Sequence, residues 1–212
     1  MPLDPPDADA PDLNRLDGGE AGSAGDSVTV ESGTMDDVDA VADLWVALAD
    51  GQRSYGTHLA GAENRPDAAD AAARAVVTDG LVVARGPDSG EADLDDTETD
   101  GADSDGTGSP RSEPGAIVGF VTFGVESGRY DLDVTRGVVY NLFVRERHRG
   151  AGVGSRLLAT AESSLADAGA DVISLEVMAD NADAKRFYDR HGYEPHRVEL
   201  EKSIPGDGSD TD

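Results

Sequence analysis

A short cationic, glycine-rich segment is the part of this 212-residue sequence best suited to bind a charged ligand. Residues 145–156, RERHRGAGVGSR, hold four arginines and one glutamate, in a chain whose formal net charge is −27. Three glycines at alternate positions (150, 152 and 154) allow the main chain to approach a ligand closely. A helix predicted to begin here would present unpaired N–H groups to an anion. Together these features predict a pyrophosphate-binding site.

Two common phosphate-binding motifs do not describe this turn. A Walker A loop needs Gly-Lys-Ser/Thr, whereas Gly154 is followed by Ser155 and Arg156. The dinucleotide fingerprint G-x-G-x-x-G would place Ser155 at its third glycine, and the run RERHR precedes the first glycine. A nucleotide-binding oxidoreductase is therefore disfavoured, although Glu176 loosely matches the acid that such a site requires.

Apolar periodicity predicts the elements that must position this turn. An α/β order of strands and helices is expected, with too few helices for a doubly wound sheet. Helices are predicted to begin at Thr34, near Pro66, at the glycine turn and at Asn181, which can act as an N-cap. Strands are predicted at 28–30, 81–84, 116–123, 138–144, 172–178 and 198–203.

The acidic charge is concentrated outside one central domain. Residues 1–26, 87–114 and 205–212 carry −6, −9 and −3, which is −18 of the total of −27. Their richness in Gly, Ser, Pro and Asp predicts disordered tails and an acidic low-complexity insert at 87–114. The single domain expected over 27–204 is long enough to bury one core. Abundant Asp and only two lysines are typical of halophiles, which predicts adaptation to molar salt.

The composition also excludes several classes of function. Zero cysteines exclude disulfides, thiolate metal sites and cysteine nucleophiles. No apolar run approaches the roughly 18 residues that cross a bilayer, and the N-terminus lacks signal-peptide character, so a cytoplasmic protein without a membrane partner is expected. The acidity argues against nucleic acid as a partner. The four histidines share no ligand spacing, so no metal site is predicted, and His148 is expected to be solvated.

The glycine turn and the residues after it resemble the GNAT superfamily of N-acetyltransferases. The segment 149–154, RGAGVG, is similar to that family's acetyl-CoA loop, Gln/Arg-x-x-Gly-x-Gly/Ala. The family's downstream spacing is matched by Asn181, Ala184, Phe187, Tyr188, Gly192 and Tyr193. The specific likeness covers 138–195, and a looser likeness spans about 27–203.

The resemblance implies a fold and a co-substrate. The fold would be α/β (α+β), a mixed and mostly antiparallel sheet with a central pair of parallel, splayed strands flanked by helices. Acetyl-CoA would lie with its pantetheine arm along the strand edge at Leu142, Phe143 and Val144, where a main-chain N–H would polarise the thioester carbonyl. Its pyrophosphate would lie on Arg149, Gly150, Ala151, Gly152, Val153, Gly154 and Ser155.

The resemblance also implies roles for three side chains. Asn181 would contact the cofactor; the alternative is that it only caps its helix, and it can also do both. Tyr188 would be the general acid that protonates the departing CoA thiolate, since a phenol and a thiol have comparable acidity. Glu176 resembles the base of the ribosomal-protein alanine N-acetyltransferases. Its rivals are Glu126, Asp131 and Asp133, because the strand at 138–144 offers only Tyr140 and Asn141 where many relatives have an acid.

The sequence therefore predicts an acyltransferase that moves an acetyl group from acetyl-CoA to a primary amine by direct attack in a ternary complex. The alternative is a non-catalytic acyl-CoA-binding or sensor module of the same fold. The acceptor stays open among peptide amines, lysines, polyamines and small amino compounds. Acids near the first helix, such as Asp36, Asp37 and Asp39, would suit a cationic amine. A monomer or a homodimer is expected.

Overall fold

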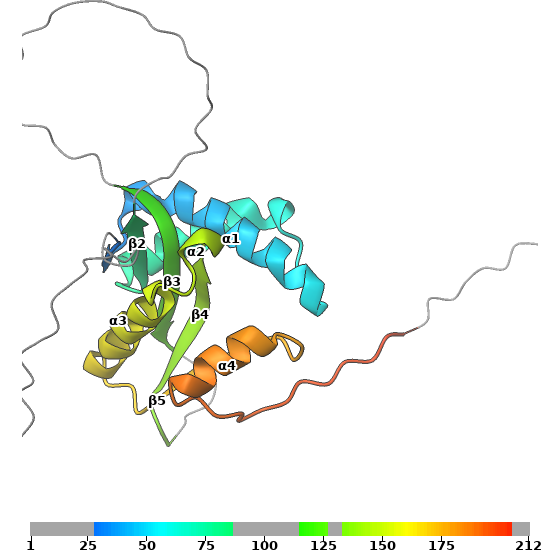
Figure 1. The fold of residues 1–212 in the computed structure, drawn as a ribbon. Coiled ribbons are helices and arrows are strands. Elements are labelled where there is room, and N and C mark those ends of the chain that lie inside the picture. The colour runs from blue at the N-terminus through cyan, green and yellow to red at the C-terminus, as the bar shows by residue number, and fades with distance from the viewer. Residues whose placement is uncertain (1–27, 87–114, 127–132, 205–212) are drawn as a thin grey trace, which may run out of the picture.

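The computed structural model describes residues 28–86, 115–126 and 133–204 (Figure 1). The predicted disordered tails, the insert 87–114 and the candidate base Asp131 lie outside these residues. Five strands form one sheet in the order β1-β2-β3-β4-β5. They are β1 (Thr29–Ser32), β2 (Leu81–Gly86), β3 (Ala116–Val125), β4 (Arg136–Val144) and β5 (Val172–Leu175). Neighbours are antiparallel except β4 and β5, which are parallel, so the predicted mixed sheet is confirmed.

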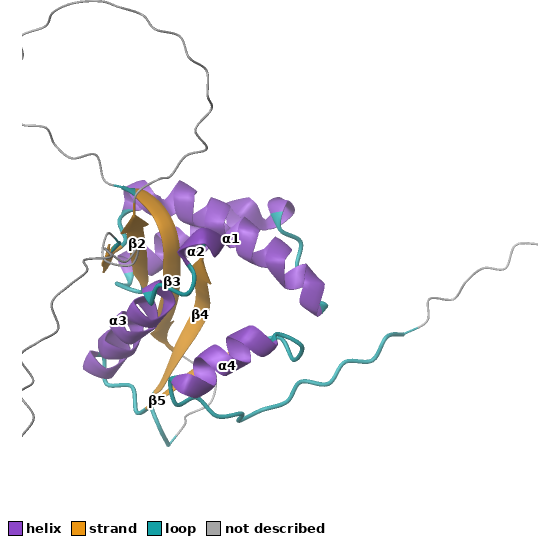
Figure 2. Ribbon diagram, in the orientation of Figure 1, coloured by secondary structure: helices purple, strands orange, loops and turns teal. Residues whose placement is uncertain are grey.

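Helices cover both faces of this sheet, as Figure 2 shows. The α-helices are α1 (Val38–Gln52), α2 (Arg65–Val77), α3 (Val153–Asp167) and α4 (Ala182–Arg190). Short 3-10 turns precede or follow them at η1 (Met35–Asp37), η2 (Arg53–Tyr55), η3 (Ala62–Asn64) and η4 (Glu146–His148). The predicted helix starts near Thr34 and Pro66, at the glycine turn and at Asn181 all agree with these bounds.

The hydrophobic core is split into two layers by the sheet. Phe120 of β3 packs with Val41 and Leu44 of α1, while the next residue, Val121, packs with Leu157 and other residues of α3. Successive side chains of a strand point to opposite faces, so β3 is buried on both sides. This explains why the third predicted strand reads as a continuous apolar run rather than an alternating one.

Two predicted strands differ from the structure. β5 ends at Leu175, three residues before the predicted end at Met178. Residues 198–203 form no strand, and Val198 and Leu200 are 82% and 91% exposed. The segment runs away from the sheet (Figure 1). Its alternating apolar residues therefore have neither a neighbouring strand to pair with nor an apolar face to pack against. The parallel pair β4–β5 consequently lies at one edge of the five strands rather than at their centre.

A buried ion pair fixes the start of α1 to the sheet. The Asp37 carboxylate accepts hydrogen bonds from the Thr34 N–H (2.8 Å) and from Arg85 Nη2 (2.6 Å), and its side chain is 5% exposed. Burial acts to raise the pKa of Asp37, and these hydrogen bonds outweigh it and lower the pKa. We expect Asp37→Asn to reduce the free energy of unfolding at pH 7 by about 2 kcal/mol, measured in urea, because Arg85 keeps a weaker, neutral partner.

The pH dependence of the stability difference between wild type and Asp37→Asn tests the role of the Asp37 carboxylate. A carboxylate with a depressed pKa stabilises the fold above its unfolded pKa, and this stabilisation is lost as the pH falls through the folded value. The difference between wild type and Asp37→Asn should therefore shrink near pH 3. Asp39→Asn is the matched control, because the Asp39 side chain is 85% exposed and should change stability little. Equal losses in the two variants would contradict the prediction.

Candidate functional site

The site is built around a wedge between β4 and β5. The two strands pair from Arg136↔Val172 only as far as Val139↔Leu175, where their pairing ends. In the pairing of β4 with β3, Thr122 faces Asn141 and Phe123 faces Val139, so Tyr140 is the extra residue of a bulge. A bulge bends its strand. The last residues of β4 therefore diverge from β5, and their main-chain edge on that side is open to pair with an extended ligand.

The glycine turn closes the end of this wedge. Gly150 and Gly152 both have φ of +77°, a left-handed conformation that glycine adopts without strain. Gly152 is the N-cap of α3, so the N–H groups of the first helical turn have no carbonyl one turn earlier to accept them. A Cβ added at either glycine would meet nothing within 4 Å. The turn thus has the donors, the helix dipole and the open space that a pyrophosphate needs.

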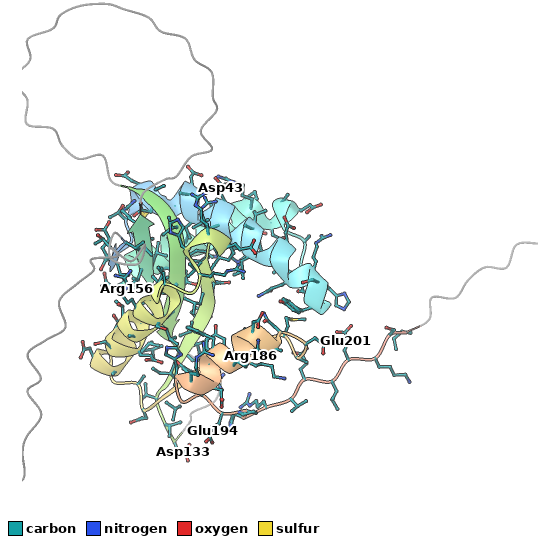
Figure 3. All side chains as sticks on the ribbon, in the orientation of Figure 1. Asp43, Asp133, Arg156, Arg186, Glu194 and Glu201 are labelled. Carbon is teal, nitrogen blue, oxygen red and sulfur yellow. The ribbon has the colours of Figure 1, made fainter. Side chains whose placement is uncertain are left out.

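Arginine side chains brace the turn through main-chain carbonyls. Arg145 Nε donates to the Ile117 carbonyl (3.3 Å), and Arg149 Nε donates to the Val144 carbonyl (2.9 Å). Arg156 Nη1 donates to the Val28 carbonyl (2.9 Å), which ties α3, where Figure 3 labels Arg156, to the N-terminal side of β1. The cationic cluster is therefore part of the framework, and its charge is held in fixed positions beside the turn.

The structure corrects the expectation for His148. Its side chain belongs to the 3-10 turn η4 and is 8% exposed, so the residue is buried rather than solvated. The His148 N–H donates to the Arg145 carbonyl (2.9 Å), and Arg147 Nε lies 3.2 Å from His148 Nε2. The 3-10 turn places the imidazole against the protein. The run of charged residues around His148 in the sequence does not indicate this burial.

Helix α4 packs against the first turn of α3. Asn181 caps α4, since its side-chain oxygen accepts from the Ala184 N–H (3.0 Å), which confirms the predicted N-cap. A Cβ at Gly154 would lie 3.6 Å from the Phe187 ring, which is an ordinary contact distance, so the first turn of α3 lies directly against α4.

His191 is a residue of this junction that the sequence analysis left unassigned. His191 Nδ1 lies 2.8 Å from the Phe187 carbonyl, and His191 Nε2 lies 3.0 Å from Ser155 Oγ. Because a carbonyl only accepts, Nδ1 must carry the proton, and in the neutral ring Nε2 accepts from the Ser155 hydroxyl. The 36 positions between the two residues hide this pairing in the sequence.

Tyr188 lies in the same apolar layer as the open end of β4. It packs against the core that Leu142 and Leu175 also contact, with its ring edge-on to Phe187 (5.2 Å) and to Tyr193 (5.7 Å). Burial raises the pKa of Tyr188 to about 12. The phenol therefore holds its proton throughout the neutral and mildly alkaline range.

The candidate bases lie in different surroundings. Glu176 follows the last residue of β5 directly and is exposed, so it lies at the mouth of the wedge rather than within the strand. Glu126 is engaged with Arg136, whose Nε lies 2.8 Å from Glu126 Oε2. Asp133 is exposed. Asn141 of β4, which stands where many relatives have an acid, donates a hydrogen bond to Thr122 Oγ1 (2.8 Å). Of these groups, Glu176 is the acid adjacent to the point where β4 and β5 separate.

Within residues 28–86, 115–126 and 133–204, no group of three or more His, Cys, Asp or Glu side chains is placed to hold a metal ion. None of the helices in these ranges is long and apolar enough to cross a membrane.

Comparison with known proteins places the sequence beside one family and one enzyme. A sequence model described as the acetyltransferase (GNAT) family matches residues 81–193. The aminoalkylphosphonate N-acetyltransferase of Salmonella typhimurium is 31% identical over 90 residues, which are 42% of this chain and 58% of that enzyme. The chain thus matches less than two thirds of this relative's length.

Solved structures show the same fold at low sequence identity. A GCN5-related N-acetyltransferase from Ralstonia eutropha JMP134 has a TM-score of 0.57 and 19% identity, covering 84% of this chain and 98% of its own. The NatC complex bound to Gag peptide and CoA contains a chain with a TM-score of 0.55 and 15% identity, covering 81% of this chain and 87% of its own.

Proposed function

Because the chain belongs to the acetyltransferase (GNAT) family, we propose that it transfers an acetyl group from acetyl-CoA to a primary amine by direct attack in a ternary complex. The single observation that supports this most is the wedge that ends at a glycine turn. It combines an open strand edge, which suits an extended amide-bearing arm, with a helix N-terminus, which suits a pyrophosphate.

Acetyl-CoA is the proposed donor, and this chain offers a group for each of its parts. The edge of Leu142, Phe143 and Val144 would pair with the pantetheine amides, and one N–H would donate to the thioester carbonyl oxygen. The main chain of residues 150–155 would hold the pyrophosphate, with Arg149 beside it. Asn181, which caps the N-terminus of α4, would contact the same ligand, as the resemblance implies.

The proposed chemistry is a balanced addition and elimination. Glu176, directly or through water, takes a proton from the ammonium form of the acceptor. The neutral nitrogen attacks the thioester carbon, and the tetrahedral intermediate then expels the CoA thiolate. Tyr188 donates its phenolic proton to that sulfur, and the nitrogen loses its second proton to solvent as the amide forms. Solvent then returns a proton to Tyr188 and takes the proton held by Glu176, so one proton is released per turnover. The products are the acetylated amine and CoA.

An acceptor screen tests this function. The full-length protein is incubated with acetyl-CoA and a panel of peptide amines, lysine, polyamines and small amino compounds, and release of CoA thiol and the intact mass of each acceptor are measured. A mass gain of one acetyl group with one thiol released supports the proposal. The name of the Salmonella relative is the reason to include aminoalkylphosphonates in the panel.

A non-catalytic acyl-CoA-binding module is the alternative to an enzyme. It would keep the glycine turn but would need neither a proton donor nor a base. A rise in melting temperature with CoA, and no acetylation across the whole acceptor panel, would favour it.

The pKa of Tyr188 leads to a prediction for the pH profile. The acid must be protonated, and burial raises its pKa to about 12 rather than the usual value near 10. We therefore expect no decline in kcat attributable to Tyr188 from about pH 8 to about pH 10.5. Stopped assays of CoA release across this range check it. A falling limb near pH 10 that disappears in Tyr188→Phe would contradict it.

Other properties of the chain stay predictions from composition. Adaptation to molar salt is supported by the excess of acids over bases, 44 to 17, and by the preference for Arg over Lys. A cytoplasmic location and a monomeric or homodimeric state are expected on the same basis. None of these bears on the chemistry of the wedge.

A further inference from the structure

A hollow lies between α1 and the end of β4. Its volume is about 700 Å³, and it is lined on one side by Ala47 and Gly51 of α1 and on the other by the end of β4 and the arginine turn. The residues of that second wall are Phe143, Arg145, Glu146, Arg147 and Arg149. Small residues on the helix leave the space, and charged residues form the opposite wall.

This hollow and the glycine turn lie on opposite faces of the sheet. Phe143 packs with the α1–α2 layer, with its ring 6.4 Å from that of Phe120. The next residue, Val144, belongs instead to the layer of Val153 and α3. A ligand on the first turn of α3 therefore approaches β4 from one face, and a ligand in the hollow approaches it from the other. A direct transfer needs two substrates that meet in this way.

The wall of the hollow is cationic in a strongly acidic protein. It has three arginines and one glutamate, whereas the whole chain has a net charge of −27. The bonds from Arg145 Nε to the Ile117 carbonyl and from Arg149 Nε to the Val144 carbonyl hold these guanidinium groups in place. Such bonds use one donor of five, so the terminal amino groups can still bind a carboxylate or phosphonate. Preorganised guanidinium groups lose little freedom on binding.

Two of the acids expected to attract a cationic acceptor are engaged in ion pairs. Asp37 is paired with Arg85 at 2.6 Å, and Asp39 with Arg65 at 3.3 Å. Both pairs neutralise acids at the start of α1, while the hollow lies near its other end, at Ala47 and Gly51. The side chains that line the hollow itself carry a net positive charge.

We propose that the hollow binds an oxyanion of the acceptor, so that the preferred substrates are amines that also carry a carboxylate or phosphonate. This inference rests on the proposed acetyl transfer and specifies its substrate class. The amine would extend from the hollow toward the bulge in β4, and the oxyanion would remain against Arg145 on the cationic wall. An amine without an acid group would bind more weakly, because it makes no charge-assisted hydrogen bond to that wall.

Gly51 provides a test that leaves the arginine framework intact. A Cβ at Gly51 would meet nothing within 4 Å, so a longer side chain can be added without displacing a neighbour. Gly51→Glu places a negative charge in the hollow, and Gly51→Gln is its uncharged control of the same shape. A second pair is Arg145→Gln with Arg74→Gln, an exposed arginine of α2 that carries the same charge and lies outside the hollow.

The measurement is kcat/KM for matched acceptors, 2-aminoethylphosphonate and β-alanine against butylamine and β-alaninamide. Wild type should prefer the anionic members by about tenfold or more, the usual size of a charge-assisted contact. Gly51→Glu and Arg145→Gln should each lower kcat/KM for the anionic members by about tenfold, mainly through KM. In Gly51→Glu the neutral members should be unaffected. Arg145→Gln also loses the bond to the Ile117 carbonyl that braces the turn, so its neutral members should fall less than its anionic ones. All acceptors should be unaffected in the two control variants.

Other results would overturn the inference in distinguishable ways. Equal activity on anionic and neutral acceptors would disprove the oxyanion site and leave acetyl transfer intact. Weaker binding of acetyl-CoA by Gly51→Glu in calorimetry, with binding of 3′-dephospho-CoA unchanged, would assign the hollow to the phosphate of the donor instead. Binding of acetyl-CoA without acetylation of any acceptor would overturn the proposed function, and the inference with it.

Discussion

Replacing Tyr188 with phenylalanine is expected to lower kcat for acetyl transfer by about 100-fold, at the lower end of the usual range for general acid catalysis. The variant keeps the ring that packs edge-on to Phe187 and Tyr193, so the apolar layer should be preserved. It loses only the buried proton donor, whose raised pKa keeps it protonated. The dissociation constant of acetyl-CoA and the melting temperature should change little.

Tyr193→Phe is the matched control for this experiment. Tyr193 is a neighbouring phenol whose hydroxyl donates to Glu162 Oε1 (2.8 Å), so its proton is committed to a structural contact. Burial, together with that contact, also raises the pKa of Tyr193. Its loss should reduce stability by about 1 kcal/mol and leave kcat within a factor of a few. If Tyr188→Phe retained full turnover, the assignment of Tyr188 as the acid would be wrong.

Gly152→Ala is expected to weaken acetyl-CoA binding by about tenfold or more. Alanine at the observed φ of +77° is strained by about 1–2 kcal/mol, so the turn would relax and redirect the N–H groups that begin α3. In addition, the added methyl group would project into the open space above the turn. Calorimetric titration with acetyl-CoA at constant salt measures the change.

Gly169→Ala is the control that distinguishes a loss of ligand affinity from the general effect of backbone strain. Gly169 follows α3 at its other end, has φ of +85°, and likewise has nothing within 4 Å of an added Cβ. Both variants should lose about 1–2 kcal/mol of unfolding free energy, and only Gly152→Ala should lose affinity. Similar affinities in the two variants would show that the glycine turn does not hold the pyrophosphate.

Local patterns were sufficient to predict much of the framework. The N-cap at Asn181, the helix starts and the glycine turn depend on residues a few positions apart, and the structure contains all of them. The mixed sheet was implied by the resemblance to the GNAT superfamily, because apolar runs indicate strands but do not specify which strands pair or in which direction. The predicted strand at 198–203 is wrong, because alternation describes a strand only when a partner edge and an apolar face are present.

Contacts between distant residues were beyond prediction from these patterns. Ser155 meets His191 across 36 positions, and Arg156 meets the Val28 carbonyl across 128. The C-terminal segment, where Figure 3 labels Glu201, reaches the α1–α2 connection, since His58 Nε2 lies 2.6 Å from Glu201 Oε1. Such pairs depend on how helices pack across a sheet, and no spacing in the sequence encodes them.

The sequence alone determined that a cationic, glycine-rich turn begins a helix, because backbone freedom and helix ends are local properties, and on that basis it predicts an anion site there. Only the tertiary structure decided which groups surround that anion and where a second charged ligand could lie. Phe143 and Val144 are adjacent in the chain, yet the pleat of β4 places them in different layers. The same arginine run therefore borders the α3 turn on one face of β4 and the hollow beside α1 on the other.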